Sequence, residues 1–146
     1  MPVIEIHSPD AGPGRDALRT LSRSVTDCLG IDAGHCWVIW NQLDRSSYYR
    51  PEWDESSSAP PVVLASCKET YPPEARARLL TTIAAGVADL SGTDPAAVYV
   101  ALRRVGSGDL WVRGAVWSDP DLGASPDTQP HATGLQPVNQ KESTHP

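Results

Sequence analysis

PVIEIH, residues Pro2–His7, is the stretch that decides the fold of this chain. β-Branched and polar residues alternate along it, which predicts a strand with one buried face that carries Pro2, Ile4 and Ile6. Proline has no backbone N–H to donate and is therefore tolerated at the first position of a strand. The position has a second interpretation. Removal of Met1 would leave Pro2 as a free secondary amine, which is both a base and a nucleophile.

A helix and another strand follow this segment. From about Pro13 the chain carries apolar residues at helical spacing, and the pattern ends near Gly30. The apolar positions are Leu18, Leu21, Val25 and either Cys28 or Leu29. The next stretch, GHCWVIWNQL (34–43), is apolar and has the length of a strand. The first unit is therefore predicted to be β-α-β.

The same order recurs in the second half of the chain. PVVLASCKE, which begins at Pro61, predicts a strand, the segment from Pro72 predicts a helix, and AVYVALRRV (97–105) predicts a strand. Right-handed crossovers make the strands within each unit parallel. The predicted fold class is α+β with two layers: two tandem β-α-β units form a four-stranded sheet with both helices on one face, and a short C-terminal hairpin follows.

The predicted division of the chain places all regular structure in one domain. The domain spans residues 1–118 and consists of two units, at about 2–43 and 61–105, a linker at 44–60 and a hairpin at 106–118. A disordered tail is predicted at 119–146. The linker is polar but carries three aromatic residues. Either these residues fasten a linker to the surface, or the segment is a loop that covers a pocket.

Composition excludes several classes of function. The chain has 146 residues, 40% of them hydrophobic, and a net charge of −6, so it lacks the basic balance expected of a protein that binds nucleic acid or an anionic membrane. No segment reads as a signal peptide or membrane span, which predicts a cytoplasmic protein. Three cysteines without CxxC spacing favour free thiols over disulfides or zinc. We expect neither a metal nor an organic cofactor.

A strand that begins at Pro2, followed by a helix and a strand and then duplicated, resembles the tautomerase superfamily. PVIEIH is similar to the opening of 4-oxalocrotonate tautomerases. Two fused units in a chain of this length resemble the trimeric branch that includes malonate semialdehyde decarboxylase and cis-3-chloroacrylic acid dehalogenase. PVVLASCKETYPPEARARLL and DPAAVYVALRRVGSGDLWVRGAVW follow the decarboxylase pattern in order and length. The resemblance covers about Pro2 to Trp117 and implies a tautomerase/MIF-like fold.

The resemblance implies that Pro2 is a general base or acid for keto–enol proton transfer on a small 2-oxo or carbonyl acid. Independently of the family, burial in an apolar site and neighbouring cations would lower the pKa of a proline amine until it is neutral near pH 7. Other functions stay open. They are a Pro2-dependent decarboxylase or hydratase, an enzyme that forms an imine through Pro2, and a catalytically idle trimer that acts as a binding or scaffold protein.

The resemblance also implies partners for Pro2. Where the dehalogenase and the decarboxylase carry paired arginines, this chain reads CKETY, which leaves Lys68 and Tyr71 to bind substrate. Lysine holds a carboxylate as a point charge and cannot form the fork of arginine. His35 is a candidate acid or base, or simply a solvated histidine at a strand end. Arg15 and Arg113 are candidate ligands for a carboxylate, or surface cations.

Two further features bear on the surface of the protein. Arg103 and Arg104 are adjacent in a predicted strand, so they point to opposite faces and at most one serves a given pocket. A sheet with both helices on one face leaves its other face uncovered. The residues expected to need cover are Trp37, Ile39, Trp40, Tyr99 and Leu110. The resemblance implies that a homotrimer buries them.

Overall fold

The computed structural model describes residues 1–121. Its helices and strands, in chain order, are β1 (Val3–Ser8), α1 (Arg15–Leu29), β2 (Trp37–Gln42), β3 (Val62–Lys68), α2 (Pro73–Ser91), β4 (Tyr99–Val105), β5 (Leu110–Val112) and β6 (Ala115–Trp117). Short 3-10 turns flank these strands: η1 (Ala33–His35) precedes β2, η2 (Arg45–Ser47) follows β2, and η3 (Pro95–Ala97) precedes β4. The prediction of a disordered tail concerns residues that lie almost wholly outside the described part.

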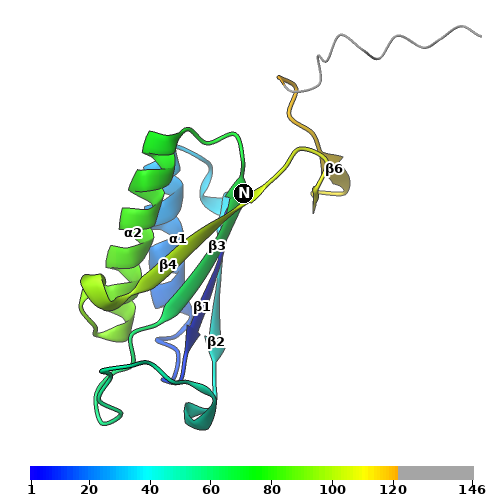
Figure 1. Ribbon diagram of the computed structural model, residues 1–146. Coiled ribbons are helices and arrows are strands. Elements are labelled where there is room, and N and C mark those ends of the chain that lie inside the picture. The colour runs from blue at the N-terminus through cyan, green and yellow to red at the C-terminus, as the bar shows by residue number, and fades with distance from the viewer. Residues whose placement is uncertain (122–146) are drawn as a thin grey trace, which may run out of the picture.

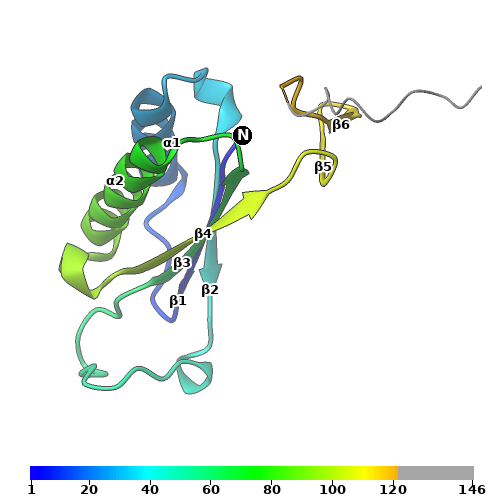
Figure 2. The same ribbon diagram turned by 45° about the horizontal axis from the view of Figure 1, so that its top comes forward.

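The main sheet has the strand order β2-β1-β3-β4. β1 pairs in parallel with β2, β3 pairs in parallel with β4, and the two central strands β1 and β3 are antiparallel. Both helices cover the same face of this sheet (Figures 1 and 2). β5 and β6 form a separate antiparallel hairpin that projects from the end of β4 (Figure 1). The predicted fold class is confirmed.

Equivalent contacts recur in the two halves of the chain. The Trp37 N–H donates to the Pro2 carbonyl at 3.1 Å, and the Tyr99 N–H donates to the Pro61 carbonyl at 3.2 Å. Each helix ends at a glycine, Gly30 or Gly92, with a φ of 65° in the left-handed region. The duplication inferred from the sequence is therefore a duplication of structure.

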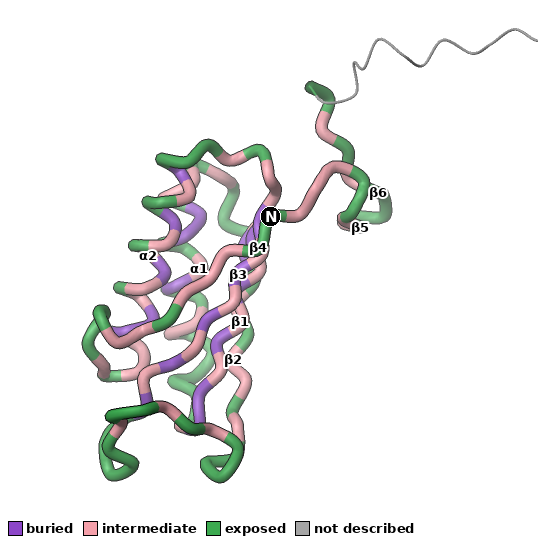
Figure 3. Tube along the Cα trace, viewed as in Figure 1, coloured by how far each residue is buried: buried purple, intermediate pink, exposed green. Residues whose placement is uncertain are grey.

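The core lies between the sheet and the helices. Burial alternates along β1 and β3 (Figure 3), because alternate side chains of a strand point to opposite faces of the sheet. Its fully buried members from the strands and helices are Ile4, Ile6, Val63, Ala65, Cys67, Leu21, Val25, Leu79, Ile83 and Val87. The helices contact each other at Gly86, where an added Cβ would lie 2.5 Å from Leu21 Cδ1. Glycine at this position therefore permits the close packing of α1 on α2.

The opposite face of the sheet is uncovered. Trp37, Ile39 and Tyr99 are 56%, 41% and 56% exposed on this outer face. The prediction that Trp40 belongs with them is wrong. Strand alternation turns Trp40 to the helix side, where it packs against the core and its Nε1 donates to the Asp10 carbonyl at 3.1 Å. None of the helices described within residues 1–121 is long and apolar enough to cross a bilayer.

Candidate functional site

Pro2 lies at one end of the main sheet, where β1 and β2 begin and β3 and β4 end (Figure 1). Its side chain is fully buried. The parallel pairing of Val3 with Trp37, taken one residue back, places Pro2 opposite Cys36. The antiparallel pairing of Val3 with Ser66 places it opposite Cys67 on the other side. The start of the chain is therefore held between two neighbouring strands.

The amino group of Met1 shows how this end of the sheet acts on an amine. Partial burial is the largest cause that lowers the pKa of this group below its usual value, and the charges of Lys68 and Arg113 lower it further. Cys67 and Cys36 act in the opposite direction, and the net pKa is lowered. The surroundings of the amino terminus therefore shift the equilibrium of this amine towards its neutral form.

The C-terminal hairpin brings Arg113 and Lys68 into this region. The Arg113 guanidinium, at a residue with a φ of 54°, hydrogen-bonds Nε2 of His35 in η1. The Lys68 ammonium lies 4.4 Å from the centroid of the Trp117 ring, a cation–π contact. Three predicted site residues, His35, Lys68 and Arg113, thus lie around the amino terminus, and two of them touch the hairpin.

Tyr71 lies at the same end of the sheet, between β3 and the start of α2. Burial raises the pKa of its phenol, and the nearby Cys67 thiol contributes to this shift. Arg76, in the first turn of α2, donates from Nη1 to the Tyr71 carbonyl at 3.0 Å. This side of the site therefore combines a phenol and a guanidinium.

Arg76 and Arg104 are site residues that the sequence analysis did not select. Burial raises the pKa of Cys67, while the amino terminus, Arg76 and Arg104 act to lower it, so both arginines lie near this thiol. Arg104 is the partner of Cys67 in the register of β3 with β4. The signal in the sequence was the alternation of β4. It assigns Arg103 to the outer face with Tyr99, and Arg104 to the other face.

Arg15 stands apart from this group of cations. It is exposed at the start of α1 and lines a groove of about 250 Å³ between α1 and β2, together with Ser22, Cys36 and Val38. It is not among the charges that act on the amino terminus. The groove reaches Cys36, on the side of Pro2 away from Lys68.

The cations at this end of the sheet lack acidic partners. Within residues 1–121 the ion pairs are Arg19 with Asp16 and Arg45 with Asp10. None involves the four cations near Pro2, which are Lys68, Arg76, Arg104 and Arg113. Glu69 follows Lys68 in the chain, but its carboxylate accepts the backbone N–H of Ser107 at 3.1 Å. An acidic protein thus gathers unpaired positive charge where its amino terminus is buried, and this arrangement suits an anionic ligand.

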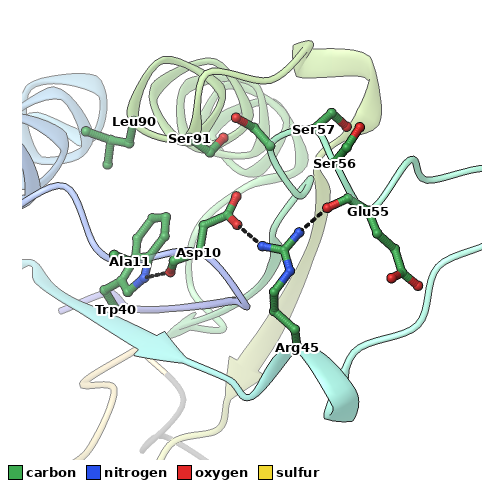
Figure 4. A pocket seen from close by; sticks show the side chains of 10 residues that line it. Asp10, Ala11, Trp40, Arg45, Glu55, Ser56, Ser57, Leu90 and Ser91 are labelled. Carbon is green, nitrogen blue, oxygen red and sulfur yellow. Dashed lines mark hydrogen bonds and ion pairs between the residues drawn. The ribbon is translucent and has the colours of Figure 1, made fainter.

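A larger polar pocket, of about 500 Å³, lies at the opposite end of the sheet (Figure 4). Its polar groups bind one another. Asp10 accepts from Arg45 at 2.9 Å and from the backbone N–H of Ala59 at 2.7 Å, and Arg45 also donates to the Glu55 carbonyl. Because these groups already have partners, we assign the pocket a structural role in holding residues 44–60.

Aromatic side chains also order this segment. Tyr48 and Trp53 meet edge to face with ring centroids 5.2 Å apart, and the Arg45 guanidinium lies 5.2 Å from the Trp53 ring centroid. The Tyr48 hydroxyl donates to the Pro60 carbonyl. These aromatic contacts lie within the segment, and Tyr49 is 86% exposed, whereas Arg45 and Ala59 attach the segment to Asp10. The interpretation of the segment as a loop over a functional pocket stays a prediction.

Asp10 provides a test of this structural role. Replacing Asp10 with alanine leaves the fully buried Ala59 N–H without an acceptor, so we expect the free energy of unfolding to fall by about 1–3 kcal/mol. Asp10→Asn is the matched control. Its amide oxygen can still accept that N–H while the exposed ion pair is lost, which costs about 0–1 kcal/mol. Urea unfolding measures both, and equal losses would show that the Ala59 hydrogen bond contributes nothing.

Comparison with known proteins identifies the fold. No family model and no curated protein matches the chain. A structure titled Pt0534 inactivated by 2-oxo-3-pentynoate superposes with a TM-score of 0.70 at 15% identity and covers 83% of this chain and 98% of that one. A fused 4-OT asymmetric trimer gives 0.68, with the same identity and coverages. A member of the cis-3-chloroacrylic acid dehalogenase family gives 0.64 at 19% identity, over 81% and 85% of the two chains. These likenesses confirm the tautomerase-like fold expected from the sequence.

Proposed function

We propose that the chain is an enzyme of the tautomerase superfamily that uses the amine of Pro2, freed by removal of Met1, for keto–enol proton transfer on a small 2-oxo or carbonyl acid. One observation carries this proposal. In a protein of net charge −6, the cations around the buried amino terminus have no carboxylate partners among the described residues. A carboxylate substrate would supply the missing negative charge.

The amine supplies the base. A general base works best when its pKa lies near the pH of the reaction. Burial and the charges of Lys68 and Arg113 act on the amino group of Met1 in the direction required, and the amine of Pro2 would begin one residue further into the same surroundings. A neutral Pro2 nitrogen takes a proton from the enol hydroxyl, or from the carbon beside the carbonyl, and returns it at the other position.

The cations bind and orient the acid. Arg76 and Arg104 on one side of Pro2 offer the two-pronged donor geometry that suits a carboxylate. Lys68 and Arg113 on the hairpin side neutralise the charge that develops on the carbonyl oxygen as the enolate forms. The substrate-binding set in this proposal therefore retains Lys68 and Arg113 from the sequence analysis, with Tyr71 as a further donor, and leaves Arg15 out.

His35 acts as an acid or base beside the carbonyl. Arginine can only donate hydrogen bonds, so the Nε2 atom that meets Arg113 is an acceptor and the neutral ring carries its proton on Nδ1. That tautomer can offer Nδ1–H to an oxygen of the substrate. Arg113 thereby fixes which nitrogen of His35 is available.

The assembly that would surround this site is a homotrimer. Its support is the exposed apolar face of Trp37, Ile39 and Tyr99, together with the fused 4-OT proteins of the same fold, whose structures are trimers. The free thiols Cys36 and Cys67 suit a reducing compartment, so we place the enzyme in the cytoplasm.

Arg104→Ala tests the carboxylate-binding role. The loss of a charged hydrogen bond worth about 1.5–3 kcal/mol should raise KM for a 2-oxo acid roughly tenfold to a hundredfold, with a smaller change in kcat. Arg103→Ala is the matched control, because it removes the same charge one residue away on the outer face. Steady-state kinetics compares the KM values of the Arg104→Ala and Arg103→Ala variants. Equal KM values in both variants would remove Arg104 from the site.

The proposed function itself is tested by ketonisation of phenylenolpyruvate, with protein whose N-terminus mass spectrometry identifies as Pro2. Turnover that depends on a free Pro2 supports the proposal. No turnover with several 2-oxo acids would instead favour a catalytically idle binding or scaffold protein. Borohydride treatment in the presence of a 2-oxo acid separates base chemistry from imine chemistry, because only an imine is trapped as a covalent adduct.

A further inference from the structure

Two cysteines lie on either side of Pro2. Cys36 is its neighbour towards β2 and Cys67 its neighbour towards β3, in the registers of those strands with β1. Their residues are 6% and 1% exposed, and Cys67 faces the helix layer together with Pro2. Both thiols are close enough to the amino terminus that, as thiolates, they would raise the pKa of its amine. No step of the proposed mechanism uses them.

The two thiols do not form a disulfide. Both are free, and one strand separates them, so their Cα atoms lie about 9–10 Å apart, beyond the reach of a disulfide. They also do not serve as anions. Burial is the main cause that raises the pKa of Cys36 to about 11 and that raises the pKa of Cys67, so both thiols are protonated near pH 7.

A protonated thiol is a poor partner for an ammonium. It is a weak hydrogen-bond acceptor and behaves in a protein core as a small apolar group. A serine hydroxyl at the same place would accept a hydrogen bond from a protonated amine and stabilise it. The neighbours of Pro2 therefore fill the space beside the amine without offering a good acceptor.

The other groups that face this end of the sheet include one carboxylate, that of Glu69, which accepts the Ser107 N–H and is not among the charges that act on the amino terminus. The cations are Lys68, Arg76, Arg104 and Arg113, with Arg15 and Arg19 along the groove at Cys36. The other titratable groups are His35, which hydrogen-bonds Arg113, and Tyr71, whose pKa is raised by burial. The Ser22 hydroxyl donates to the Cys36 carbonyl at 2.8 Å. Among residues 1–121, no carboxylate is among the charges that act on the amino terminus.

We infer that Cys36 and Cys67 are positioning residues that keep the Pro2 amine free of hydrogen-bond acceptors and so hold it in its basic, unprotonated form. The inference rests on the proposed function, in which this amine is the base. It adds a reason why two thiols, and not two hydroxyls, occupy the register positions beside Pro2. The cations at this end of the sheet repel a protonated Pro2 amine, and the two buried thiols offer it no good hydrogen-bond acceptor.

The test is direct titration of the Pro2 amine by ¹⁵N NMR in the full-length, Met1-processed protein. Cys67→Ser should raise the titration midpoint by about half a pH unit or more, because the hydroxyl stabilises the ammonium, whereas Cys67→Ala should leave it close to that of the wild type. Cys36→Ser is a second variant with the same expected direction. Cys28→Ser, on the helix α1 and away from the amine, should leave the midpoint unchanged. The acidic limb of the kcat/KM profile should move with the midpoint.

Midpoints that do not differ between the serine and alanine variants would overturn the inference, since a purely packing role predicts lower stability in both and no difference in titration. The NMR measurement needs no turnover, so it separates the two proposals. A low midpoint that Cys67→Ser raises, in a protein inactive on all 2-oxo acids, would support the thiol role and reject the enzyme. Turnover of a 2-oxo acid, with a titration midpoint that neither serine variant changes, would support the enzyme and reject the role of the thiols.

Discussion

Pro2→Ala should lower kcat/KM for the ketonisation of phenylenolpyruvate by roughly a hundredfold to ten-thousandfold, the contribution typical of a positioned general base. The variant keeps an amino terminus but loses the proline ring, which is fully buried at the start of β1. Without the ring, the amine becomes a mobile, better hydrated primary amine. The nitrogen is then no longer held at one position beside the substrate, so proton transfer slows. Steady-state kinetics measures this loss.

A matched control uses wild-type sequence that retains Met1. In that protein the Pro2 nitrogen is part of an amide and cannot act as a base, so it should be as impaired as the variant. Mass spectrometry defines each N-terminus, and light scattering shows whether the assembly is unchanged. Activity of Pro2→Ala within a few-fold of the processed wild type would reject Pro2 as the catalytic residue, whatever the fold.

Local patterns were sufficient to predict the fold. Alternation in Pro2–His7, the recurrence of proline at Pro61, and the helix-ending glycines Gly30 and Gly92 are properties of neighbouring residues, and the structure reproduces them. Trp40 was misplaced because it was grouped with Trp37 and Ile39 by hydrophobicity. The period of the strand assigns it to the opposite face.

The site was harder to predict because its parts come from distant segments. Lys68 and His35 were selected by resemblance, and the structure places both near the amino terminus. Arg76 and Arg104 were not selected. Their nearness to Pro2 depends on the residue at which α2 begins and on the pairing of Arg104 with Cys67, and no local pattern encodes that register. The whole set of site residues stays a prediction until it is tested by mutation.

Assembly is the second large effect that we expect, and Ile39→Asp tests it. Ile39 is 41% exposed in the middle of β2, on the apolar outer face that we propose to be buried between subunits. A carboxylate placed there would be buried without a partner in the trimer, at a cost of several kcal/mol, whereas in the monomer water would solvate it. We expect light scattering to show a trimer for the wild type and a monomer for the variant at micromolar concentration.

Ala85→Asp provides the matched control for this change, because it adds the same charge at an exposed position of α2, on the helix side of the sheet. It should remain a trimer. Circular dichroism must show that Ile39→Asp is folded, since the core on the other face of β2 is untouched. A trimeric Ile39→Asp, or a monomeric wild type, would contradict the proposed interface. A folded monomer that retains full activity would show that Pro2 and the cations of a single chain, Lys68, Arg104 and Arg113 among them, complete the site without a neighbouring subunit.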